Sequence, residues 1–335
     1  MKEFKILAID GGGIKGLYSA TILRLLEEKL QQEHGPETRV VDYFDLICGT
    51  STGGLIALGL SLRVPMATIC SFYEDEGPGI FPNPDSKAAF LRQTLLSGKY
   101  SDGPLKAALQ KIFGDKKLGE SHCLLCIPSF DFTNGTYAVF RYDHSEGNLN
   151  RHNKIPYIDI ALATSAAPTY FPLAQIGEEN NTQYVDGGVW ANNPALVGLI
   201  EAMRYFVGEG KAFQKLRILS VASLNIGMKK EPLARRERSF RHWVKDLFEL
   251  GLIGQSEFCD YFLHTLTQNS GFPLDYTRIP SHVISGEHAS YISLDNAGEK
   301  SLALMKQLGT DMAYKYGAKP EVQAFFQHPK LYRTR

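Results

Sequence analysis

Residues 44–62 read FDLICGTSTGGLIALGLSL, and this stretch decides the fold class. Phe44 to Cys48 is a short apolar run, which is typical of a buried strand. Gly49 to Gly54 indicates a tight turn, and Leu55 to Leu62 is apolar enough for a buried helix. The stretch therefore predicts a strand that turns sharply into a helix.

The same succession occurs at the N-terminus. An apolar run over Phe4–Ile9 is followed by three glycines and by a helical pattern from Gly16 to Glu33. Strand, glycine turn and helix repeated within sixty residues predict an α/β fold, here a three-layer α/β/α sandwich with a central, mostly parallel sheet. Further strands are expected near 124–127, 136–140, 183–185 and 216–221. Further helices are expected near 65–77, 158–164, 194–206, 240–252 and 297–316, with a loop over 77–84.

The composition narrows the class of protein. With 36 basic and 36 acidic residues the net charge is zero, so we expect no DNA or RNA partner. No signal peptide is visible and no apolar segment is long enough for a membrane span, which predicts a cytoplasmic protein. No repeat or linker forces a boundary. We expect a catalytic core over 1–222 and an elaboration of the same domain, with a candidate regulatory role, over 223–335.

The five cysteines suggest no cofactor. Cys123 and Cys126 form a C-x-x-C, but two leucines separate them within an expected strand, so we interpret both as core residues. No second pair follows at the spacing of a zinc site. We expect neither a metal ion nor an organic cofactor.

Ser51 is the candidate nucleophile. Gly49-Thr50-Ser51-Thr52-Gly53 fits G-x-S-x-G between a strand and a helix, which is the setting that this motif requires. The small residues Gly49 and Gly53 let the turn close, and the helix N-terminus favours a developing oxyanion. The alternative is that Ser51 is an ordinary helix N-cap.

Residues 10–16, DGGGIKG, form a second glycine loop. Gly11, Gly13 and Gly16 fit the dinucleotide-binding G-x-G-x-x-G after a strand and before a helix, but Asp10 would repel a pyrophosphate. No acidic residue lies cleanly at the end of a second strand about twenty residues on. Three consecutive glycines also suit an oxyanion hole, because their backbone N–H groups can converge on one point. A tight turn is the third interpretation.

Asp186 is the candidate base. It ends an expected strand and precedes Gly187 and Gly188, which would let the backbone pack closely around it. An ordinary aspartate is a weak base toward a serine hydroxyl, but burial raises its pKa. The alternative is a turn aspartate before glycine. A triad would instead need a histidine, and four follow in chain order without a distinctive context: His242, His264, His282 and His288.

Taken together, these blocks resemble the patatin-like phospholipases. That family combines a DGGG loop ending in Arg-Gly or Lys-Gly, a G-x-S-x-G elbow and an Asp-Gly-Gly or Asp-Gly-Ala block, and all three occur here in order. The stretch ATSAAPTYFP at 163–172 also looks like the family's block before the catalytic aspartate. The resemblance covers about residues 4 to 222. It implies a Ser51–Asp186 dyad, an oxyanion hole of Gly11, Gly12 and Gly13, and metal-free hydrolysis of membrane phospholipid esters through an acyl-enzyme. Lys15 stands where many relatives have arginine.

The sequences of the first two blocks also resemble those of bacterial family members that act in anti-phage defence and are activated by cyclic dinucleotides. A basic segment beyond the family blocks contains four arginines that are candidate contacts: Arg235, Arg236, Arg238 and Arg241. They fit a solvated loop, a membrane-docking face or a phosphate site for an activator. The expected partners are thus membrane phospholipid, at the inner face of the membrane, and a cyclic dinucleotide. The alternatives are an acyltransferase or thioesterase with the same dyad, a dinucleotide-dependent oxidoreductase, and a catalytically silent binding module.

Overall fold

The computed structural model describes residues 1–82, 98–225, 237, 240–269, 271–282, 284 and 286–334. Its framework is an eight-stranded sheet in the order β5-β6-β3-β2-β1-β7-β8, with β4 paired to β3 outside this path. The strands are β1 (Glu3–Ile9), β2 (Leu46–Gly49), β3 (Leu124–Asp131), β4 (Thr136–Arg141), β5 (Ala174–Ile176), β6 (Thr182–Asp186), β7 (Lys215–Val221) and β8 (Leu274–Ile279). The repeated strand–turn–helix pattern thus gave the correct fold class.

The sheet is parallel at its centre and antiparallel at one end. β3, β2, β1, β7 and β8 pair in parallel, whereas β4 and β6 pair antiparallel to β3 and β5 pairs antiparallel to β6. The parallel strands β1 and β2 end side by side, with Ile9 opposite Gly49. Because the carboxyl ends of parallel strands meet at one edge, the glycine loop after β1 lies beside the elbow after β2.

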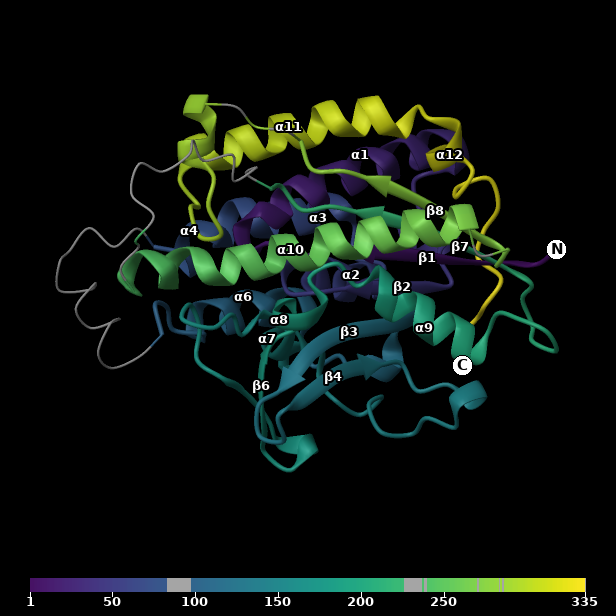
Figure 1. The fold of residues 1–335 in the computed structure, drawn as a ribbon, viewed down its shortest axis with the longest axis horizontal. Coiled ribbons are helices and arrows are strands. Elements are labelled where there is room, and N and C mark those ends of the chain that lie inside the picture. Colours follow the sequence, from purple (N-terminus) through teal and green to yellow (C-terminus); the bar gives the residue numbers. More distant parts are fainter. Residues whose placement is uncertain are drawn as a thin grey trace.

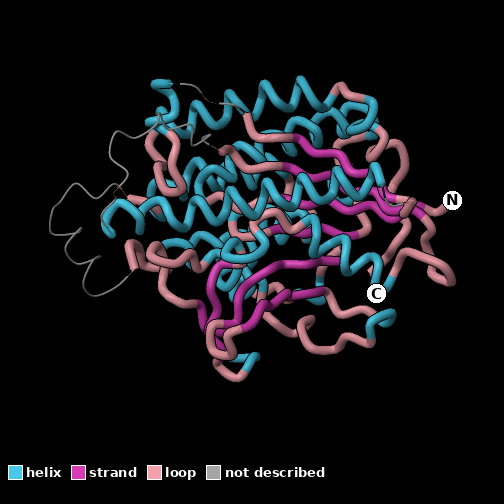
Figure 2. The backbone as a smooth tube through the Cα atoms, viewed as in Figure 1, coloured by secondary structure: helices cyan, strands magenta, loops and turns pink. Residues whose placement is uncertain are grey.

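Helices cover both faces of the sheet (Figures 1 and 2). In the view of Figure 1, α9 and α10 cross the front face, and α1, α2 and α3 lie behind. The helices are α1 (Gly16–His34), α2 (Thr52–Ser61), α3 (Met66–Ser71), α4 (Gly77–Ile80), α6 (Gly103–Phe113), α7 (Tyr157–Ser165), α8 (Gly188–Ala191), α9 (Ala195–Tyr205), α10 (Phe240–Asn269), α11 (Glu299–Gly317) and α12 (Pro320–Gln323).

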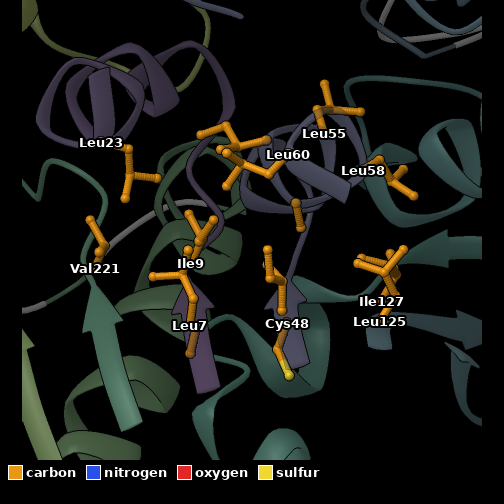
Figure 3. Close-up of a cluster of buried hydrophobic side chains, with 14 of the residues drawn as sticks. Leu7, Ile9, Leu23, Cys48, Leu55, Leu58, Leu60, Leu125, Ile127 and Val221 are labelled. Carbon is orange, nitrogen blue, oxygen red and sulfur yellow. The ribbon is translucent and has the colours of Figure 1, made fainter. Parts of the chain in front are cut away.

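The core lies between the strands and the helices α1 and α2. Figure 3 shows Leu7 and Ile9 of β1 and Val221 of β7 facing the helical side chains Leu23 and Leu60. All five are buried. This apolar layer lies next to the carboxyl ends of β1, β2 and β7. Because it is closely packed, it supports the loops at that edge rigidly.

Several segments differ from the sequence prediction. The expected loop over 77–84 is wrong at its start, because the chain continues from α3 through a π-helical turn at Phe72–Glu76 into α4. Pro84 lies outside the described residues. Helix α10 is more than twice as long as expected, and β5, β8 and α6 were not anticipated.

The C-terminal third joins the same sheet. β8 pairs in parallel with β7 along its whole length, from Leu274 opposite Leu216 to Ile279 opposite Val221. Helix α11 packs along α1 so closely that a Cβ on Gly309 would lie 2.8 Å from the Tyr18 carbonyl oxygen. Residues far beyond 222 therefore help to position the loops at the carboxyl edge of the sheet.

Candidate functional site

Ser51 occupies a sharp turn between β2 and α2. Its backbone angles are φ 53° and ψ −124°, a conformation that costs a non-glycine residue on the order of 1–3 kcal/mol. The turn can close because of its glycines: a Cβ on Gly49 would lie 2.1 Å from the Gly53 carbonyl oxygen, and one on Gly53 would lie 2.2 Å from the Ile9 carbonyl oxygen. The close packing of the turn therefore holds Ser51 in this strained conformation at the edge of the sheet.

Thr164 fixes the elbow from the neighbouring helix α7. The Ser51 N–H donates to Thr164 Oγ1 at 2.9 Å, and the Thr164 hydroxyl donates to the Pro128 carbonyl oxygen at 2.6 Å. This chain of hydrogen bonds ties the elbow to β3. Thr164 belongs to the stretch 163–172 noted in the sequence, but the pattern gave no sign of this role.

Asp186 lies at the end of β6, directly beside Ser51. The Gly188 N–H donates a hydrogen bond 2.7 Å long to Asp186 Oδ1, and the Ser51 hydroxyl lies close enough to the carboxylate to lower its pKa. Asp186 is only 2% exposed, and Ser51 is 8% exposed. Burial raises the pKa of Asp186 to about 7, and the interactions with the Ser51 hydroxyl and the Gly188 N–H oppose this shift.

The glycines after Asp186 permit its position. A Cβ on Gly187 would lie 2.3 Å from the Pro128 carbonyl oxygen, and one on Gly188 would lie 2.6 Å from a methyl carbon of Leu252. Position 187 therefore needs to be glycine for β6 to end this close to β3, whereas a larger residue at position 188 would require the Leu252 side chain to shift. The Gly188 N–H is also the donor that aligns the carboxylate.

The glycine loop presents two free donors beside Ser51. The Gly11 N–H donates to the Asn192 carbonyl oxygen at 3.0 Å, and the Ile14 N–H donates to the Leu294 carbonyl oxygen at 2.9 Å. Within the described ranges, the N–H groups of Gly12 and Gly13 have no acceptor, and both residues line the same cavity as Ser51. The N–H group of Gly11 is thus already hydrogen-bonded, so of the three glycines expected to form an oxyanion hole only Gly12 and Gly13 have N–H groups available for it.

Asp10 and Lys15 anchor this loop. Arg278 on β8 binds both carboxylate oxygens of Asp10, at 2.6 and 3.2 Å, and the Ser256 hydroxyl donates to the same carboxylate at 3.2 Å. Lys15 pairs with Glu249 of α10 at 3.0 Å. Both charged side chains are therefore paired rather than directed into the cavity. Gly16 packs against Thr52, and a Cβ on Gly16 would lie 2.1 Å from Thr52 Oγ1.

The cavity above Ser51 is apolar. It measures about 680 Å³ of space between atoms, including its mouth. Polar groups are present on seven of its lining side chains: Ser51, Thr52, Tyr73, Ser165, Tyr170, Asp186 and Asn192. Its apolar walls are formed mainly by Ile14, Leu55, Phe72, Ile80, Phe81, Leu105, Tyr170, Phe171, Phe248, Leu252 and Leu294. Such a cavity suits an acyl chain whose ester group lies at the serine.

Two buried polar atoms at the cavity have no protein partner among the described residues. They are the Ser165 hydroxyl and Asn192 Oδ1. The Asn192 amide nitrogen donates to the Leu252 carbonyl oxygen and to Ser256, which holds the side chain in place. Sequence reasoning did not single out Ser165 or Asn192, because each stands in an unremarkable polar context.

No histidine among the described residues lines the cavity. His264 on α10 is exposed and lies 3.6 Å from Asp260, and His288 is also exposed. The arginines Arg235, Arg236 and Arg238 lie outside the described residues, and Arg241 is described only as backbone in the first turn of α10. Within the described ranges, no group of three His, Cys, Asp or Glu side chains is arranged to hold a metal ion. The five cysteines are all free and buried.

Comparisons with known proteins find relatives that match most of this chain. The family model described as "Patatin-like phospholipase" matches residues 7–199. A cGAMP-activated phospholipase of Pseudomonas aeruginosa is 30% identical over 97% of this chain and 92% of its own length. One from Escherichia coli is 30% identical over 97% of this chain and 93% of its own length. Patatin-like protein 2 of Arabidopsis thaliana is 32% identical over 92% of this chain and 83% of its own length. Human GIVD cytosolic phospholipase A2 is 11% identical, with a TM-score of 0.44 over 96% of this chain and 60% of that chain.

Proposed function

This chain belongs to the patatin-like phospholipase family, a family of serine acyl hydrolases, and from that premise we propose that Ser51 and Asp186 form its catalytic dyad. The observation that carries the proposal is the placement of the Ser51 hydroxyl in one cavity with a buried carboxylate, Asp186, whose pKa burial raises to about 7. A base with a pKa near the working pH is well suited to accept a hydroxyl proton. Membership of the family also removes the dinucleotide-dependent oxidoreductase from consideration.

The geometry supports a two-step reaction. Asp186 accepts the Ser51 proton while the serine oxygen bonds to the ester carbonyl carbon, and the carbonyl oxygen becomes an oxyanion held by the N–H groups of Gly12 and Gly13. Asp186 then donates the proton to the leaving alcohol oxygen, which leaves an acyl group on Ser51. Water repeats the sequence, so its proton passes through Asp186 back to Ser51 and a fatty acid departs. The scheme uses no metal ion, so we expect EDTA to leave the rate unchanged.

The substrate class follows from the cavity and from one helix beside it. Phe248 and Leu252 line the cavity from the inner face of α10. The outer face of this helix exposes large apolar side chains at Leu247, Leu250, Phe258, Tyr261 and Phe262. Aromatic and aliphatic side chains on the outside of a helix suit the interface of a lipid layer. We propose that the enzyme works on phospholipid at a membrane surface, although no described helix is both long and apolar enough to cross one.

We also propose that a cyclic dinucleotide activates the enzyme. The support is the name of two relatives that cover almost the whole chain, both described as cGAMP-activated phospholipases. Three of the four arginines suggested for this role lie outside the described residues, and only the backbone of Arg241 is described. Liposome hydrolysis titrated with cGAMP and other cyclic dinucleotides tests the proposal, and equal full activity without any ligand would contradict it.

Release of fatty acid from phospholipid liposomes tests the dyad itself. We expect Ser51→Ala to abolish release, with or without a dinucleotide, while the circular dichroism spectrum stays that of the wild type. We expect Asp186→Asn to be nearly as inactive, because an amide cannot accept the serine proton. Retained activity in a folded Ser51→Ala variant would contradict the assignment of the nucleophile.

A further inference from the structure

A second apolar depression lies directly behind the catalytic base. It is an open groove with a volume of about 800 Å³. Its lining contains no charged side chain among the described residues, and it consists chiefly of Phe130, Phe132, Ala166, Pro168, Phe171, Pro172, Leu173, Val185, Val189 and Trp190. The polar atom of Trp190 is already used, because its indole N–H donates to the Ser129 carbonyl oxygen at 2.8 Å. The groove therefore offers mainly apolar surface.

The groove and the catalytic cavity share one wall. Phe171 lines both, and neighbouring residues of one chain segment alternate between them: Ser165 and Ala167 line the cavity, whereas Ala166 and Pro168 line the groove. The end of β6 divides in the same way. Val185 faces the groove and Asp186 faces the cavity. The two spaces are thus separated by a single layer of backbone.

This dividing segment is held in a strained and fixed form. Thr169 has φ 71°, which is unusual for a β-branched residue. The Lys99 N–H donates to the Thr169 carbonyl oxygen at 2.8 Å, and the Tyr100 N–H donates to the Tyr170 carbonyl oxygen at 2.7 Å. The Tyr170 and Phe171 N–H groups both donate to the Ala167 carbonyl oxygen. These hydrogen bonds fix the segment and therefore the position of the groove relative to the cavity.

The rim of the groove exposes large apolar side chains. Phe132 is 56% exposed, Val189 is 44% exposed and Leu173 is 39% exposed. They come from three separate parts of the chain: Phe132 follows β3, Val189 lies in α8 and Leu173 precedes β5. Three exposed apolar residues converging on one apolar groove favour a ligand that is itself a hydrocarbon.

We propose that this groove binds the second acyl chain of a diacyl phospholipid while the chain to be cleaved occupies the cavity at Ser51. This inference rests on the proposed phospholipase function and adds the substrate class: diacyl lipids are preferred to their single-chain products. The shared residue Phe171 places the two chains on either side of one ring. The Phe171 ring itself is supported by Phe81 at 5.8 Å and Tyr100 at 6.0 Å between centroids.

A kinetic experiment measures the contribution of the second chain. The substrates are glycerophospholipids with one hydrolysable short-chain ester and one ether-linked chain of two to eight carbons, both positional isomers, used as monomers below the micelle concentration. We expect kcat/KM to rise at least tenfold with the ether chain length in the wild type. We expect the rise to disappear in the triple variant Phe132→Ser, Leu173→Ser, Val189→Ser. The matched control Ile200→Ser, Tyr314→Ser, Leu331→Ser, which changes three other exposed apolar residues, should behave like the wild type.

A binding experiment reads the groove without any hydrolysis. The chain has two tryptophans, and the variant Trp243→Phe leaves only Trp190, which lines the groove. A non-hydrolysable diether phospholipid with bromine near the end of one chain should quench Trp190 fluorescence by at least half at saturation. The same lipid should quench at least tenfold less efficiently in the triple variant.

The two readouts separate the possible failures. Quenching of Trp190 without hydrolysis of any ester would contradict the proposed phospholipase function and leave the groove as a lipid-chain site. Hydrolysis that does not depend on the ether chain, or quenching that is unchanged in the triple variant, would overturn the inference about the groove. Circular dichroism would reveal a triple variant that fails to bind because it has lost its fold. In that case the dependence of kcat/KM on ether chain length in the wild type decides whether a second chain is bound.

Discussion

The Ser51 hydroxyl lies beside the carboxylate of Asp186, in a cavity that no histidine among the described residues lines. The backbone N–H of Gly188 donates a hydrogen bond to this carboxylate. Burial, rather than a neighbouring charge, makes Asp186 a stronger base than an ordinary aspartate. The position of Asp186 at the buried end of β6, beside the strained elbow, therefore raises its basicity.

The pH dependence of activity should follow from this placement. The pKa of Asp186 is about 7, and only the ionised carboxylate accepts the serine proton. We expect kcat/KM for a soluble short-chain ester to fall about tenfold for each pH unit below about 7 and to level off above it. A profile that stays flat down to pH 5 would mean that the base has an ordinary carboxyl pKa.

The same raised pKa predicts that activity costs stability. Because the pKa is higher in the folded state than in the unfolded chain, the folded state binds more protons between about pH 4 and 7, and this contribution to stability is lost as the pH rises through 7. We expect Asp186→Asn to be more stable than the wild type at pH 8, by roughly 2–4 kcal/mol, and to lose this advantage near pH 4.5. Urea unfolding at both pH values measures the difference. An equal difference at the two values would contradict the raised pKa.

Gly12 should be sensitive to a single methyl group. A Cβ there would lie 2.0 Å from Ser223 Oγ, so Gly12→Ala must displace the loop and tilt the free N–H groups. We expect kcat to fall about a hundredfold with little change in KM, because these donors act mainly on the transition state. Removing the obstructing side chain with Ser223→Gly should restore part of kcat. The control Gly79→Ala, where a Cβ meets nothing within 4 Å, should be neutral; a rise in KM alone for Gly12→Ala would instead make the loop a binding element.

The ion pair between Asp10 and Arg278 should matter for stability. Both side chains are nearly inaccessible to water, so Arg278→Met leaves a buried carboxylate without its partner. We expect a loss of about 3–5 kcal/mol in the free energy of unfolding. The double variant Asp10→Asn, Arg278→Met should recover a large part of it, as measured by urea denaturation. A double variant as unstable as Arg278→Met alone would show that the charge pairing is not the cause.

Much of this architecture could be predicted from the sequence, for identifiable reasons. The elbow at Ser51 and the glycine loop carry local signals, since strand, glycine turn and helix follow each other within a few residues. Arg278 and Asn192 could not be found in this way, because they reach the loop through strand pairing and helix packing across distances of 268 and 181 positions in the chain. The start of α4 was mistaken for a loop because Gly77 and Pro78 are also acceptable in the first turn of a helix.

The central claim, that Ser51 is a nucleophile activated by Asp186, is tested most directly by covalent labelling. The intact protein is incubated with a fluorophosphonate probe at pH 8, with and without cGAMP, and the labelled peptide is identified by mass spectrometry. We expect one label on Ser51, no label in Ser51→Ala, labelling at least a hundredfold slower in Asp186→Asn, and wild-type labelling in each single His→Ala variant. A label on another residue, or a folded histidine variant that labels as slowly as Asp186→Asn, would contradict the dyad.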